Sequence, residues 1–129
     1  MLSKLKSLWK SEGQEKIKTP QDYDADFQLT YKNLIVGTLK LRKGVWYFQY
    51  SDDFKNQNLI KPLVDFPDIE KEYCSDELQP FFAHRIPGLG QPKVKKIVEE
   101  ENLNAENEAQ MLERFGKVSI ANPFHLEVV

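Results

Sequence analysis

The sequence predicts an α+β domain in which a curved antiparallel sheet, partly barrel-like, is covered by about three short helices. The first half contains three segments of alternating apolar and polar residues, separated by two-residue turns. The second half contains amphipathic segments bounded by helix start and stop residues, before the alternation returns near the end. A chain of 129 residues fits one domain that buries a core without help from a metal or disulfide.

The first three predicted strands form an antiparallel meander. Lys32-Asn33 and Lys43-Gly44 are the predicted turns, because Asn and Gly tolerate positive φ. Gly37 lies inside the second strand and indicates a bulge or a close backbone approach. The three strands are FQLTY at 27–31, LIVGTLKLR at 34–42 and VWYFQYS at 45–51.

The middle of the chain is less regular. Pro62 and Pro67 exclude a long helix and a central strand, so we expect a loop with one short edge strand near Pro62 to Phe66. A helix is expected to start at Ser75 as its N-cap. Pro80 would leave that helix short or kinked.

Two more helices and a closing strand pair follow. Pro92 suits the first position of one helix, and Asn104 is the expected N-cap of the next, with Gly116 just past its end. The segments KVSIA (117–121) and FHLEV (124–128) are expected to be the closing strands.

Residues 1–26 differ from the rest, so we place the folded domain at residues 27–129. Residues 1–10 form a short basic amphipathic pattern. A helix that docks on this domain or on a partner, or one that simply frays, is favoured over a helix on a membrane surface. Residues 11–26 are polar and are expected to be a linker.

Composition restricts the partners and the compartment. The net charge of −2 argues against nucleic acid as the main partner, and no apolar run approaches the ~18 residues of a membrane span. The single cysteine, Cys74, cannot form an internal disulfide, and no secretory leader is visible. We expect a cytoplasmic protein without a membrane partner.

The sequence lacks the residue sets that catalysis needs. There is no Gly-rich phosphate loop with a lysine, as phosphoryl transfer would need. The spacing of Cys74, His84 and His125 supports neither a nucleophilic triad nor a metal site. We expect no enzyme activity, no cofactor and no metal.

One motif suggests DNA binding as an alternative function. Residues 86–90, IPGLG, look like the hairpin of helix-hairpin-helix motifs, whose backbone N–H groups grip a phosphate. Lysines follow at 93, 95 and 96, but the glutamates at 99–101 would repel DNA.

Five segments in the same order resemble the small N-terminal domain of HipA-type toxin kinases. They are the strand LIVGTL (34–39), the strand GVWYFQY (44–50), the stretch from Pro62 to Pro67, the segment LQPFFAHRIP (78–87) and the helix end at Met111-Leu112 with Phe115-Gly116.

This resemblance implies a binding role. In those kinases the domain is fused to a catalytic core, and a copy without that core resembles HipS, the antitoxin of tripartite HipBST systems. It implies inhibition of a HipA/HipT-like serine/threonine kinase, with a HipB-like DNA-binding protein as a possible further partner. A structural subunit that does not inhibit is the other alternative.

The expected contact with the kinase is the turn after residues 81–82. Leu89 is the only sizeable apolar side chain there and would be the tip that enters the partner. The expected partner-binding residues are Phe81, Phe82, His84, Arg85, Leu89, Gln91 and Lys93.

Overall fold

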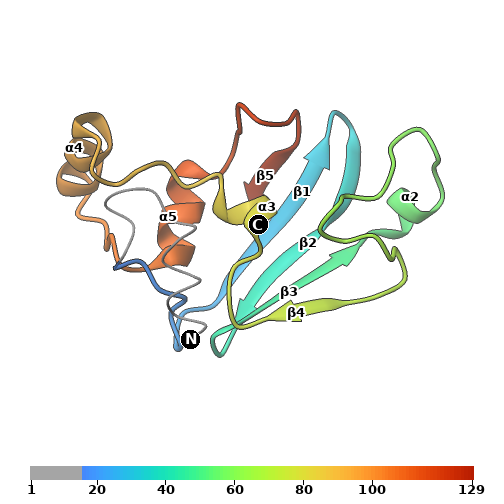
Figure 1. The fold of residues 1–129 in the computed structure, drawn as a ribbon, viewed down its shortest axis with the longest axis horizontal. Helices are drawn as coiled ribbons and strands as arrows, with labels where there is room; N and C mark the ends of the chain where they lie inside the picture. Colours follow the sequence, from blue (N-terminus) through green and yellow to red (C-terminus); the bar gives the residue numbers. More distant parts are fainter. Residues whose placement is uncertain (1–15) are drawn as a thin grey trace.

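A computed structural model describes residues 16–129, and within them the protein has an α+β fold built on one open antiparallel sheet (Figure 1). The strands lie in the order β4-β3-β2-β1-β5, so β4 and β5 are the two edges and the sheet is only partly barrel-like. The predicted meander is confirmed as β1, β2 and β3. The strands are β1 Ala25–Tyr31, β2 Leu34–Arg42, β3 Val45–Tyr50, β4 Tyr73–Ser75 and β5 His125–Val128.

Four short helices accompany the sheet in this part of the chain, one more than we expected. Figure 1 shows α2 at one side of the sheet, with α3 and α5 toward the other and α4 farthest from the strands. The helices are α2 Asp52–Lys55, α3 Pro80–Ala83, α4 Pro92–Glu100 and α5 Glu108–Phe115.

The core covers one face of the sheet. Along β3, Trp46, Phe48 and Tyr50 are buried, whereas Tyr47 is only partly buried and Gln49 is exposed. This alternation follows from the two-residue period of a strand. Rings from outside the sheet complete the core, because Phe48 packs against Phe66 at 4.4 Å and against Phe82 at 5.6 Å between ring centroids.

Gly37 marks both a bulge and a close approach, as the sequence indicated. The register between β1 and β2 shifts here, since Leu29 pairs with Gly37 and Thr30 pairs with Ile35. A Cβ atom on Gly37 would lie 2.5 Å from the carbonyl oxygen of Gln49. No larger residue fits without moving β3.

The two hairpin turns use lysine as well as glycine in the left-handed region. Lys43 and Gly44 have φ values of 49° and 77°, which are typical of a two-residue hairpin turn. In the β1–β2 turn the positive φ falls on Lys32. The sequence indicated Asn33 as the residue with the positive φ.

The polar segment before β1 is partly built into the domain, which the linker prediction missed. Ile17 and Thr19 are buried, and Lys18 pairs with Asn107 just before α5. The amphipathic segment predicted at residues 1–10 lies outside the described residues. The domain boundary before Phe27 remains a prediction.

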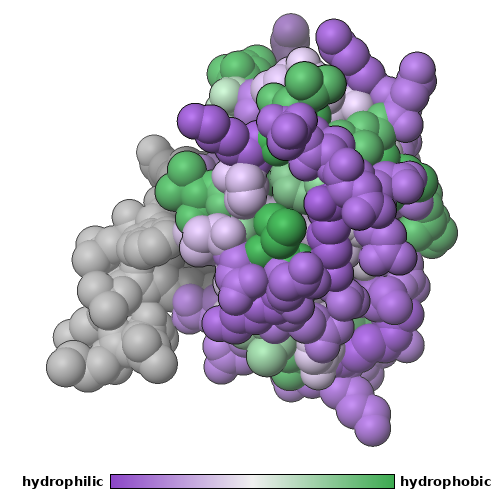
Figure 2. All heavy atoms as spheres, turned by 90° about the vertical axis from the view of Figure 1, so that its right-hand side faces the viewer, coloured by the Kyte–Doolittle hydropathy of each residue, from purple (hydrophilic) through white to green (hydrophobic). Residues whose placement is uncertain are grey.

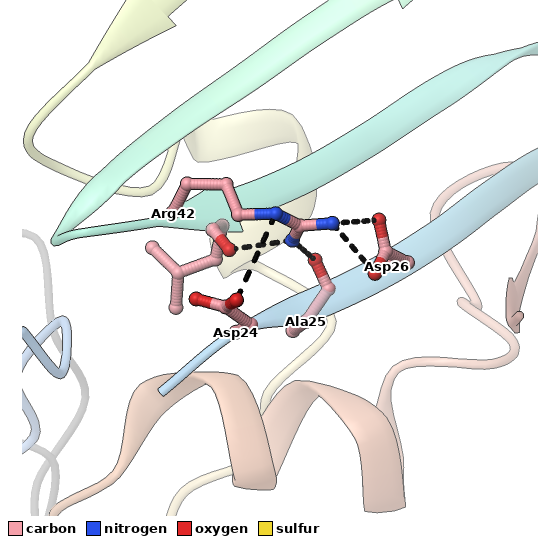
Figure 3. A network of polar contacts seen from close by, with 5 residues as sticks. Asp24, Ala25, Asp26 and Arg42 are labelled. Carbon is pink, nitrogen blue, oxygen red and sulfur yellow. Dashed lines mark hydrogen bonds and ion pairs between the residues drawn. The ribbon is translucent and has the colours of Figure 1, made fainter. Parts of the chain in front are cut away.

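Arg42 fastens the beginning of β1 to the end of β2 (Figure 3). Its guanidinium group donates to both carboxylate oxygens of Asp26 at 2.8 and 2.9 Å and to the carbonyl oxygen of Ala25 at 3.1 Å. Asp24 approaches the same group at 3.9 Å. These charge-assisted hydrogen bonds fix this end of the meander.

The helix predicted from Ser75 is wrong, because residues 73–75 form the edge strand β4. Ser75 lies opposite Trp46 on β3, and its hydroxyl oxygen accepts from the backbone N–H of Glu77 in a local turn. Cys74 is exposed on this strand. The helix begins later, with Pro80 in its first turn, where a missing N–H costs nothing.

Several other details of the secondary structure differ from the prediction. No strand forms within residues 62–66 or 117–121, which are irregular loops. The last helix starts after Asn107, whose side chain accepts from the N–H of Gln110, whereas Asn104 makes a turn just before it. Gly116 follows this helix with a negative φ, so close packing on Leu112 explains the glycine better than a left-handed cap does.

Candidate partner-binding surface

Helix α3 carries the first of the predicted contact residues, and a distant loop caps it. Gln79, at the N-cap position, makes no side-chain cap. Instead, the carboxylate of Asp65 accepts from the backbone N–H of Phe81 at 3.0 Å. A negative charge there also faces the positive end of the helix dipole.

The paired phenylalanines divide between the core and its edge. Phe82 is fully buried and lies 5.9 Å from Phe66, measured between ring centroids. Phe81 is half-buried and packs edge-on against Phe124 at 5.9 Å. Phe82, which was expected to contact the partner, therefore belongs to the core.

The apolar residue in the following turn is not an exposed tip. Leu89 is only 8% exposed and belongs to the hydrophobic core. The exposed members of the predicted set are His84, Gln91 and Lys93. The protruding contact that we expected at Leu89 is therefore absent from this turn.

Arg85 is buried and binds the loop that follows α5. One of its terminal nitrogens donates to the carbonyl oxygen of Gly116 at 2.9 Å. The other donates to Asn122 Oδ1 at 2.9 Å and to the carbonyl oxygen of Phe124 at 3.0 Å. One side chain thus fixes both ends of the segment between α5 and β5.

The hydrogen-bond acceptors of this guanidinium group are all neutral oxygens, and the group also lies over the Phe81 ring, 5.6 Å from its centroid. Burial lowers the pKa of Arg85, because the charged form loses its hydration. Its Nε atom is buried without a hydrogen-bond partner among the described residues. Burying a charge without a carboxylate partner costs free energy. Such an arrangement persists only where the surrounding structure determines it tightly, here through the loop geometry that Arg85 binds.

The segment held by Arg85 is a closed loop with an apolar tip. The backbone N–H of Leu126 donates to the carbonyl oxygen of Lys117 at 2.9 Å and closes its base. Between these residues Ile120 is fully exposed and Val118 is 59% exposed. We call residues 118–124 the Arg85 loop.

Sequence reasoning missed the Arg85 loop because Val118 and Ile120 alternate like a strand. One signal could have identified it. Residues 118–126 are the longest run without Asp, Glu, Lys or Arg in the chain. Depletion of charged residues is typical of the centre of a protein interface.

A second loop exposes apolar side chains on the side of the molecule that carries α2 (Figure 2). Leu59 is 93% exposed and Val64 is equally open. Figure 2 shows hydrophobic surface on this side, divided by polar side chains. Residues 52–77 contain eight acidic and three basic residues, so apolar groups here lie in acidic surroundings, unlike the uncharged Arg85 loop.

Helix α4 does not present an uninterrupted basic face. Lys93, Lys95 and Lys96 are exposed, but Lys96 forms an ion pair with Glu100 at 3.8 Å. The helix before the turn, α3, has only four residues. A basic face without glutamate partners would have favoured DNA binding, but Lys96 is paired with a glutamate.

From residue 16 onward, no group of three His, Cys, Asp or Glu side chains could hold a metal ion. No helix in the described part of the chain has the length and hydrophobicity to cross a membrane.

Comparison with known proteins identifies the domain. No curated protein matches the sequence significantly. The sequence model of the HipA N-terminal domain matches residues 27–120, from the third residue of β1 to the tip of the Arg85 loop. The match covers most of the 129 residues, and the chain therefore belongs to the HipA N-terminal domain family.

Proposed function

We propose that this protein is an antitoxin-type component that binds and inhibits a HipA/HipT-like serine/threonine kinase. The observation that carries the proposal is the family match over residues 27–120. A domain that packs beside a catalytic core within one chain can pack against it from another chain if it keeps the same surface. Inhibition would follow if that contact blocks the nucleotide cleft or a loop movement.

The proposed contact includes the exposed residues from the end of α3 to the first turn of α4. His84, Gln91 and Lys93 offer polar and basic groups there. Basic side chains would suit acidic or phosphorylated groups on a kinase. Phe82 and Leu89 support this segment from the core, so their role is to hold it in place.

The assay measures binding and autophosphorylation of a HipA-like kinase encoded in the same genome. We expect the wild-type protein to bind and to suppress transfer of labelled phosphate. The double variant His84→Glu with Lys93→Glu should bind more weakly, because both side chains are exposed and the substitutions reverse the local charge. Lys40→Glu, an exposed position on β2, is the matched control and should leave binding unchanged.

Two results would each reject part or all of the proposal. Binding without suppression would leave a structural subunit and reject the inhibitory role. Absence of binding by the wild-type protein would reject the whole proposal. A HipB-like DNA-binding protein is the further partner that the family resemblance implies, and it is added in a second assay.

A further inference from the structure

The Arg85 loop is a surface element that is held at both ends and carries an apolar tip. Its base is closed by the bond between Leu126 and Lys117, and Arg85 binds Gly116, just before the loop, and Phe124 at its end. Phe124 is wedged between Phe81 and the ring of Tyr31, 5.6 Å away between centroids. A preorganised loop loses little conformational entropy when it binds.

The tip of this loop has the composition of an interface centre. Ile120 is fully exposed, and Val118 is also open to solvent. No charged residue occurs from residue 118 to residue 126. An exposed apolar side chain on a rigid, uncharged support resembles the central anchors of protein interfaces.

The loop is also continuous with the proposed contact. Arg85 and Phe81 belong to the predicted set, and they touch Asn122 and Phe124 directly. Two residues of the loop are thus fixed by the segment that also carries His84. A partner that covers the exposed residues beyond α3 would meet the loop at its border.

We infer that Ile120 is an apolar anchor that enters an uncharged pocket on the HipA/HipT-like kinase, and this inference rests on the proposed function. It moves the apolar contact from the buried Leu89 to the exposed tip of the Arg85 loop. Ile120 supplies apolar contact area, while residues around His84 and Lys93 supply the charged border.

The test compares equilibrium binding of the same kinase to three variants. Ile120→Asp should raise Kd at least about tenfold, because a charge would enter an apolar pocket, and Ile120→Ala should raise it less. Leu59→Asp is the matched control, since this residue is equally apolar and 93% exposed on the α2 side. It should change Kd less than about threefold.

Each outcome either supports or overturns the role of Ile120. Unchanged binding by Ile120→Asp, with weakened binding by the His84 and Lys93 double variant, would overturn the anchor and leave the proposed function intact. Equal losses from Ile120→Asp and Leu59→Asp would also overturn it. Absence of binding by the wild-type protein would reject the proposed function itself. Thermal unfolding confirms that the variants are folded, and Ile120→Ala decides if the aspartate variant is not.

Discussion

Tyr50 shows how a single hydroxyl group holds an irregular loop against the sheet. It donates to the carbonyl oxygen of Phe66 at 2.6 Å and accepts from the backbone N–H of Leu63 at 2.8 Å. Tyr50→Phe would leave both buried groups without this partner, and we expect the free energy of unfolding to fall by about 1–3 kcal/mol in urea titrations. Tyr73→Phe is the control, because its hydroxyl group binds only the exposed N–H of Asp68, and it should cost less than ~1 kcal/mol.

The same residue predicts a dependence on alkaline pH. Burial raises the pKa of Tyr50 from 10.0 to about 12, so the folded protein holds this proton more tightly than the unfolded chain. The resulting stability is complete below pH 10 and is lost as pH rises through 12. Relative to Tyr50→Phe, wild type should lose about 2–3 kcal/mol of unfolding free energy across that interval. Parallel curves for the two proteins would contradict this.

At the level of elements, α3 depends on a cap that comes from another loop. Asp65→Ala removes the acceptor for the N–H of Phe81, and we expect a loss of about 0.5–2 kcal/mol in the free energy of unfolding. Asp76→Ala is the matched control, since that exposed carboxylate makes none of the hydrogen bonds described, and its effect should stay within about 0.5 kcal/mol. Equal effects of the two substitutions would show that Asp65 does not act as a cap.

Elements encoded by local pattern could be predicted, and those that depend on distant contacts could not. The meander follows from alternation and turn residues, and α4 from Pro92 and its apolar stripe. β4 has three residues and exists because β3 offers it a free edge. The cap on α3 comes from Asp65, sixteen positions before Phe81, which no helix-start pattern reveals.

The candidate surface was likewise predicted only in part. The Gly/Pro composition indicated a turn after α3, but only packing decides that Leu89 faces the core. The alternation of Val118 and Ile120 predicted a strand, whereas both side chains are exposed on a loop fixed by Arg85. Arg85 was expected to contact the partner, whereas it is buried and binds the loop after α5, which no local pattern reveals.

On the scale of the whole molecule, Thr19 joins three segments that are far apart in the sequence. Its hydroxyl group donates to the carboxyl oxygen of Glu108 at 2.7 Å and accepts from the indole N–H of Trp46 at 3.1 Å. The neighbouring backbone adds two bonds, one from Lys18 to Glu106 and one from Glu108 back to Lys18. The segment before β1, the sheet and α5 therefore meet at one buried polar cluster.

This cluster predicts that the three segments unfold together. Thr19→Val removes the hydroxyl group and leaves the buried polar atoms of Glu108 and Trp46 without it, so we expect a loss of about 1–3 kcal/mol. Thr38→Val, at a half-buried position on β2, is the matched control and should change the free energy of unfolding by less than about 1 kcal/mol. In a Trp9→Phe background, Trp46 is the single tryptophan and its fluorescence reports the cluster, whereas far-UV circular dichroism reports the whole fold. Both signals should shift by the same amount in Thr19→Val, because the cluster couples the segments. A fluorescence transition that precedes the circular dichroism transition would instead mean that the segment before β1 detaches on its own.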